Sequence, residues 1–122
     1  MLRQPSQFEA VLRSGIRVST RNFVARARAN DAEQARLGMI AGKKAAPRAV
    51  DRNRAKRLIR EIFRSTASRF GAYDVTVQLR NDLRAEQNIA VRGELEALFD
   101  SLVRRCMAGD ASTRTPDIPR TS

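Results

Sequence analysis

The stretch Arg52-Asn53-Arg54-Ala55-Lys56-Arg57-Leu58-Ile59-Arg60-Glu61-Ile62-Phe63-Arg64 has the spacing of a helix with two different faces. An ideal helix turns about 100° per residue, which gathers a polar set on one side and an apolar set on the other. The sequence therefore predicts a helix that seats one face on a core and presents cations on the other. The polar set is Asn53, Lys56, Arg57, Arg60 and Arg64; the apolar set is Ala55, Leu58, Ile59 and Ile62, with Phe63 at the border.

Few carboxylates offset these cations, because only Asp51 at the expected start and Glu61 lie close by. Lys43, Lys44 and Arg48 lead into the helix and add to its charge. The basic run is either a solvated surface or a phosphate-binding face. The scarcity of acidic partners one turn away favours phosphate binding, since guanidinium groups donate paired hydrogen bonds to phosphate oxygens. Composition leaves DNA, RNA and a membrane surface open as the polyanion.

The charge balance of the whole chain also indicates a polyanionic partner. The 122 residues make one domain, and 24 Lys and Arg against 13 Asp and Glu give a net charge of +11 at pH 7. A nucleic acid is the leading partner, ahead of an acidic protein or a membrane surface. The sequence lacks an apolar run long enough to cross a membrane and a hydrophobic secretory signal, so we expect a cytoplasmic protein without membrane association.

Catalytic chemistry by the chain itself is restricted. The sequence has no His and a single Cys, Cys106, which excludes imidazole catalysis, intramolecular disulfides and Cys-x-x-Cys sites. Gly42-Lys43 is an isolated pair without the rest of a P-loop. We predict no catalytic residue and no metal site in the protein. A self-sufficient nuclease would need clustered carboxylates, whereas the acids Asp31, Asp51, Glu61 and Asp74 are scattered.

The rest of the chain predicts one α+β domain in the order α-β-β-β-α-β-α. Ser6 and Glu9 form a capping box for a first helix over residues 5–12, and strands follow over 16–20, 23–29 and 36–41, the first two as a hairpin. Pro47 fits the first turn of the basic helix, which runs to residue 70 with Gly71 as its stop. A strand over 73–80 and a helix over 89–107 complete a domain of residues 1–108, and residues 109–122 are expected to form a disordered tail.

The basic helix also resembles the signature of the bacterial ribonuclease P protein subunit. The resemblance covers roughly residues 5–105 and implies a single domain with helices packed on one mixed sheet, similar to domain 2 of ribosomal protein S5. It also implies a left-handed β-α-β crossover, an exception to the usual right-handed connection. The matching segments, besides residues 52–64, are Pro5-Ser6-Gln7-Phe8, Arg36-Leu37-Gly38, Lys43-Lys44, Ala49-Val50, Asp74-Val75-x-Val77 and residues 98–105.

In this family a large RNA subunit, with bound Mg²⁺, removes the 5′ leader of precursor tRNA, and the protein is not the catalyst. The resemblance implies a 1:1 complex with that RNA, no cofactor bound by the protein alone, and contact with precursor tRNA. The residues that would bind the catalytic RNA are Lys43, Lys44, Arg48, Arg52, Asn53, Arg54, Lys56, Arg57, Arg60 and Arg64. Phe8, Leu12 and Arg26 match the positions that would line a groove for the single-stranded leader.

Two positions depart from the family pattern. Family members often carry aromatic residues where this chain has Leu12 and Arg26, so base stacking in the groove should be weaker. Arg26 can compensate through a phosphate contact or its own planar stacking. The alternative to a ribonuclease P subunit is a general basic RNA- or DNA-binding module, and reconstitution with the catalytic RNA would separate the two.

Overall fold

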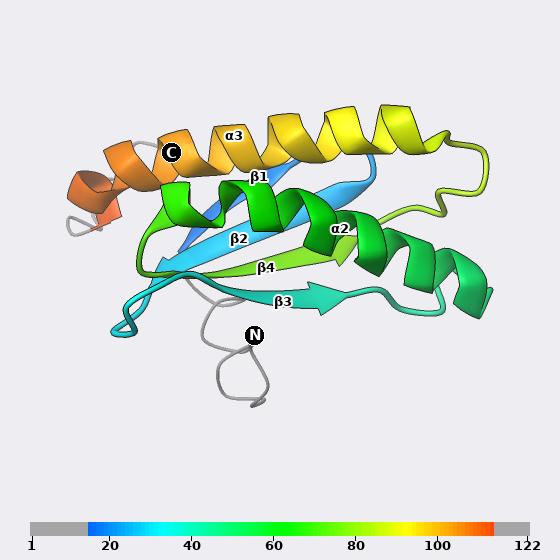
Figure 1. The fold of residues 1–122 in the computed structure, drawn as a ribbon, viewed down its shortest axis with the longest axis horizontal. Helices are drawn as coiled ribbons and strands as arrows, with labels where there is room; N and C mark the ends of the chain where they lie inside the picture. The colour runs from blue at the N-terminus through cyan, green and yellow to red at the C-terminus, as the bar shows by residue number, and fades with distance from the viewer. Residues whose placement is uncertain (1–14, 114–122) are drawn as a thin grey trace.

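The computed structural model describes residues 15–113, with side chains up to residue 108. The elements in chain order are β1 (Ile16–Ser19), β2 (Phe23–Ala29), β3 (Arg36–Ile40), α2 (Ala49–Phe70), β4 (Tyr73–Leu79) and α3 (Asn88–Thr113). The four strands form one sheet in the order β1-β2-β4-β3, and both helices cover the same face of it (Figure 1). This is the predicted α+β fold. The helix predicted over residues 5–12, with Phe8 and Leu12, lies outside the described residues.

The sheet is mixed. β2 pairs antiparallel with β1, as the predicted hairpin requires, and antiparallel with β4, whereas β3 pairs parallel with β4. The chain leaves β3, returns through α2 in front of the sheet and enters β4 beside β3 (Figure 1). With the strands pointing up and α2 toward the viewer, this step moves to the left. The crossover is therefore left-handed, as the resemblance implied.

Alternating side chains give the sheet one apolar face and one polar face. The strand bounds agree with the predictions except that Thr20, Ala41 and Arg80 fall just outside β1, β3 and β4. The apolar face packs under the helices and contains Phe23, Ala25, Ala27, Leu37, Tyr73, Val75, Val77 and Leu79. By the same register the outer face carries Arg17, Arg26, Arg28, Arg36, Asp74, Thr76 and Gln78.

The basic helix forms as predicted, with one correction at its start. α2 begins at Ala49, and Arg48 before it is extended (φ −88°, ψ 136°) with no side-chain cap hydrogen bond. Pro47 therefore precedes the helix instead of lying in its first turn. The helix ends at Phe70, where Gly71 follows with a positive φ of 71°. A positive φ lies outside the helical region, so the helix stops there, and glycine adopts this conformation without the strain that a Cβ would bring.

α3 is longer than predicted. It begins at Asn88 and continues through Gly109 to Thr113, so the predicted end near residue 107 is too early. The boundary drawn between residues 108 and 109 falls inside this helix, and residues 114–122 lie outside the described part. Within residues 15–113, neither helix combines the length and apolar character needed to cross a bilayer.

An aromatic cluster joins the two helices above the sheet. Phe63 and Phe70 of α2 meet Phe99 of α3, with ring centroids 5.8 and 6.1 Å from that of Phe99. Such pairs contribute about 0.5–1.5 kcal/mol each beyond burial of their area. Because the cluster lies on the buried side of α2, it fixes the rotation of this helix and turns the opposite, basic side outward.

Candidate nucleic-acid interface

The outward side of α2 carries cations without partners among the residues that the structure describes. Arg57, Arg60 and Arg64 are exposed and Lys56 is half-buried. Within residues 15–108, none of the four takes part in an ion pair or a side-chain hydrogen bond. We call these four residues the unpaired cationic face. The predicted residues Asn53, Lys43 and Lys44 are also exposed and also without such contacts in this part of the chain.

Arg48 and Arg52, which are also predicted to bind RNA, have guanidinium groups that contact the protein itself. Arg48 donates from Nε and Nη2 to the two carboxylate oxygens of Asp51, at 2.6 and 3.0 Å. Arg52 donates from Nη1 to the carbonyl oxygens of Ala46 and Pro47, at 2.9 and 3.0 Å. Both side chains stabilise the entry into α2.

Arg54 is held still more firmly. Its Nε donates to Oδ1 of Asn88 and its Nη1 to the carbonyl oxygen of Leu83, both at 2.7 Å, and its Nη2 donates to the carbonyl oxygen of Glu86. All five donors of a guanidinium lie in one plane, so three such contacts fix the group. Arg54 therefore fastens the loop between β4 and α3 to the basic helix.

The carboxylates near α2 lie on the side that faces α3 and its loop. Asp51 accepts from Arg48 and lies 3.7 Å from Arg84, and the Arg48 hydrogen bond, with these neighbouring charges, lowers the pKa of Asp51 below its ordinary value. Glu61 pairs with Arg92 at 3.0 Å. The described ion pairs thus neutralise acids along one flank of the helix and leave the unpaired cationic face without an acid.

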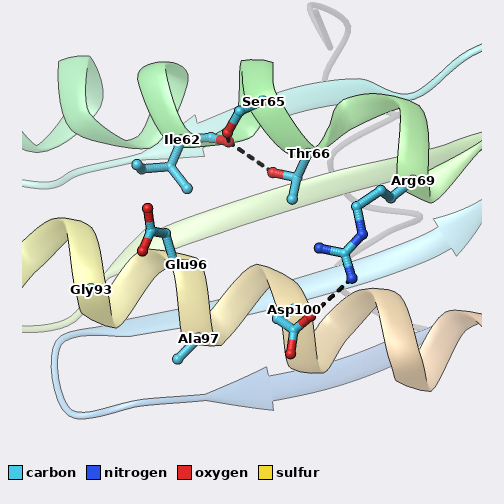
Figure 2. Close-up of a pocket in the computed structure, with 8 residues that line it drawn as sticks. All are labelled: Ile62, Ser65, Thr66, Arg69, Gly93, Glu96, Ala97 and Asp100. Carbon is cyan, nitrogen blue, oxygen red and sulfur yellow. Dashed lines mark hydrogen bonds and ion pairs between the residues drawn. The ribbon is translucent and has the colours of Figure 1, made fainter.

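A groove between α2 and α3 marks this neutralised flank (Figure 2). It has a volume of about 530 Å³. Arg69 of α2 donates to Asp100 of α3 at 2.9 Å, and Asp100 also pairs with Arg104. The Arg69 hydrogen bond lowers the pKa of the Asp100 carboxyl, with a further contribution from Arg104. Because Glu96 also lines the groove, its charge does not favour a polyanion.

The outer face of the sheet brings Arg26 beside a second arginine that the sequence reasoning missed. Arg17 of β1 stands directly opposite Arg26 of β2. Like charges opposite one another destabilise a sheet. Burial and the neighbouring Arg17 lower the pKa of Arg26, whose Nη1 donates to Oε1 of Gln78 at 3.4 Å. The signal was present in the sequence, because Arg17 and Arg26 both fall on the polar phase of the predicted hairpin.

Acidic residues do not gather into a metal site in the described part of the chain. No group of three or more His, Cys, Asp or Glu side chains among these residues is placed to hold an ion. Asp74, on the outer face, accepts two hydrogen bonds from Arg36 at 2.7 and 2.9 Å and one from Asn30 at 2.8 Å. The candidate site therefore consists of positive charge on α2 and on the outer face of the sheet.

Comparison with known proteins supports a single family. The family model described as Ribonuclease P matches residues 1–103. The ribonuclease P protein component of Thioalkalivibrio sulfidiphilus is 37% identical over 105 residues, covering 86% of this chain and 88% of the relative. That of Haemophilus influenzae is 39% identical over 100 residues, covering 82% and 84%.

Solved structures agree with the fold. The Staphylococcus aureus RNase P protein superimposes with a TM-score of 0.74 at 29% identity, covering 81% of this chain and 91% of that one. The Thermotoga maritima RNase P protein gives a TM-score of 0.70 at 30% identity, covering 84% and 94%. The family model spans most of the chain, the relatives exceed 30% identity over most of their own length, and the folds coincide. The chain therefore belongs to the bacterial ribonuclease P protein family.

Proposed function

We propose that this chain binds the catalytic RNA of ribonuclease P through the unpaired cationic face of α2, and the 5′ leader of precursor tRNA through the outer face of the sheet. By its family, the chain is a protein subunit of ribonuclease P and takes part in tRNA processing. The contacts with RNA and leader are our proposal, and so are a 1:1 complex with the RNA subunit and a cytoplasmic location.

The observation that carries the proposal is the separation of the α2 arginines into two groups. Arg48, Arg52 and Arg54 donate hydrogen bonds to other groups of the protein, whereas Arg57, Arg60 and Arg64 have no such partner in the described part of the chain. Like charges one turn apart on a helix destabilise it by about 0.2–0.5 kcal/mol per pair. Phosphates that bind between these side chains would remove that repulsion and accept charge-assisted hydrogen bonds.

The outer face of the sheet supports a contact with the leader. Arg17 of β1 and Arg26 of β2 stand opposite each other in the sheet. Neither forms an ion pair with a carboxylate among the described residues. One phosphate of a single strand placed between their guanidinium groups would relieve their repulsion. Such a contact would replace part of the stacking energy that an aromatic residue at position 26 would supply. Phe8 and Leu12, also assigned to this groove, lie outside the described residues.

We also propose that the protein does not cleave RNA by itself and that the RNA subunit, with Mg²⁺, performs the hydrolysis. Three carboxylates of the described part, Asp51, Asp74 and Asp100, are bound by arginines. We assign no residue of this chain to Mg²⁺. The chain would neutralise crowded phosphates near the RNA active site and extend the contact with the substrate.

The salt dependence of binding tests the role of α2. Replacing Arg57, Arg60 and Arg64 by Gln should lower the affinity for the catalytic RNA. It should also reduce the slope of log K against log salt by roughly 2–3, since each neutralised phosphate contributes about 0.7–0.9. A matched control replaces three other exposed arginines, Arg21, Arg80 and Arg104, by Gln.

The control variant has the same net charge as the test variant. If both lower the slope equally, bulk charge explains the binding and α2 has no special role. Leader removal at low Mg²⁺ by the reconstituted complex gives a second measurement. Full activity of the Arg57, Arg60 and Arg64 variant under that condition would refute the proposal.

A further inference from the structure

A hollow of about 290 Å³ opens on the β3 side of the unpaired cationic face. Its floor is apolar and nearly closed to solvent, because Leu37 of β3 and Phe63 of α2 are 5% and 8% exposed. The small side chains Ala35 and Ala67 leave the space open. Arg60 and Arg64 form the rim of the hollow.

The charge of this hollow differs from that of the groove between α2 and α3 in Figure 2. Glu96 and Asp100 line that groove, and Arg69, the one arginine among its described lining residues, is paired with Asp100. No carboxylate lines the hollow beside β3 among the described residues, and its two arginines are unpaired there. An apolar floor under two unpaired guanidinium groups fits a flat apolar group that carries negative charge on either side.

β3 adds hydrogen-bonding groups to this site. It is an edge strand of the described sheet, paired only with β4. An edge strand presents backbone N–H and C=O groups that lack a strand partner. Such groups could bond the polar edge of a planar heterocycle lying on Leu37 and Phe63. The volume is at the lower end of the range for small-ligand sites, which limits the occupant to about one base.

We propose that this hollow binds one unstacked nucleobase of a single-stranded RNA segment, with Arg60 and Arg64 holding the phosphates that flank it. The inference rests on the proposed binding of RNA by α2 and adds a subsite to it. Single-stranded RNA is commonly bound in this way, with splayed bases on apolar surfaces and the backbone held by cations. Arg64 and Arg60 are one helical turn apart, so both can reach the same segment of backbone.

The test fills the hollow without changing charge. Ala67→Leu adds side-chain volume to its wall, and Ala97→Leu makes the same change on α3 in the acidic groove as a matched control. The probe is a decamer of oligouridylate, compared with a decamer of the same backbone that lacks bases. We expect Ala67→Leu to weaken binding of the decamer with bases about five- to tenfold, at the low end of the losses seen when a stacking partner is removed.

The remaining outcomes separate the inference from the proposed function. Ala67→Leu should leave the salt slope and the binding of the base-free decamer unchanged. The control Ala97→Leu should leave the binding of both decamers unchanged. If Ala67→Leu binds both decamers like the wild type, the base subsite is refuted, while the RNA-binding role of α2 stands as long as Arg60→Gln weakens binding. If it weakens both decamers equally, the hollow holds backbone and the proposal is wrong. Ala35→Val narrows the hollow from its other wall and serves as a second variant should Ala67→Leu unfold.

Discussion

Replacing Arg54 by Ala distinguishes what the structure says of this residue from what the sequence says. The family resemblance places Arg54 among the residues that bind RNA, whereas the structure ties it to the loop that precedes α3. The variant should therefore lose stability and keep most of its affinity for RNA. Arg57→Ala, three residues along the same helix, should keep its stability and lose affinity for RNA.

The magnitude follows from the three hydrogen bonds that Arg54 donates. A hydrogen bond to a charged group contributes about 1.5–3 kcal/mol to stability. The three do not add in full, because the site is partly open and water can replace the guanidinium at the freed acceptors. The variant also gives up the ordering of a long side chain, which costs the wild type about 2 kcal/mol. We expect the free energy of unfolding to fall by about 2–4 kcal/mol, which lowers Tm by roughly 10 °C.

The measurement is urea denaturation of the wild type and the two variants, with RNA affinity determined well below the midpoint of each. Arg57→Ala should change stability by less than about 0.5 kcal/mol, because its side chain is exposed and unpaired. The reasoning is refuted if Arg54→Ala unfolds at the wild-type urea concentration and loses as much RNA affinity as Arg57→Ala. Arg54 would then be a phosphate contact, as the family resemblance implies.

Three further predictions concern the end of α2, its start and the outer face of the sheet. Gly71→Ala should destabilise the protein by about 1–3 kcal/mol in thermal or urea unfolding, because its φ of 71° strains any residue with a Cβ; an unchanged midpoint would contradict this. The Arg48 contact holds the pKa of Asp51 below its ordinary value of 3.8. The ionised Asp51 carboxylate therefore stabilises the folded protein above about pH 4, and this contribution is lost as the pH falls through the lowered pKa. The difference in unfolding free energy between the wild type and Asp51→Asn should accordingly be largest near neutral pH and shrink on acidification, and a difference that grows toward low pH would reverse the assigned sign. Arg17→Ser should weaken the complex for precursor tRNA with its leader and not for mature tRNA, and equal losses for both substrates would remove the proposed contact between Arg17, Arg26 and the leader.

The sequence predicted the elements well because their signals are local. Alternation over residues 23–29 and the helical spacing of 52–64 each arise within one element, and the structure confirms both. Gly71 and Gly109 show where a local signal is insufficient. Glycine costs about 1 kcal/mol inside a helix but does not oblige it to end. At Gly71 the chain takes a positive φ and α2 stops, whereas α3 continues through Gly109 to Thr113.

The candidate site was predicted less completely because partners come from elsewhere in the chain. Arg54 lies at the border of the polar face by its helical angle, and its acceptors are 29 to 34 residues away. No spacing rule connects them. The hollow beside β3 could not be predicted either, since its lining combines Ala35 and Leu37 with residues of α2 that are far away in the sequence. Arg17 could have been predicted as a site residue, because the predicted hairpin places it near Arg26.

The location of the acids, more than the net charge, decides which surface of this protein can bind RNA. Asp51, Glu61 and Asp100 all lie toward α3 or its loop, where Arg48, Arg92 and Arg69 neutralise them. The same helix therefore has a flank whose charges cancel and a face whose charges do not. A polyanion gains Coulomb energy on the second, where no carboxylate of residues 15–108 competes for the guanidinium groups. Since the aromatic cluster sets the rotation of α2, the packing of the core determines where the proposed contact with RNA can lie.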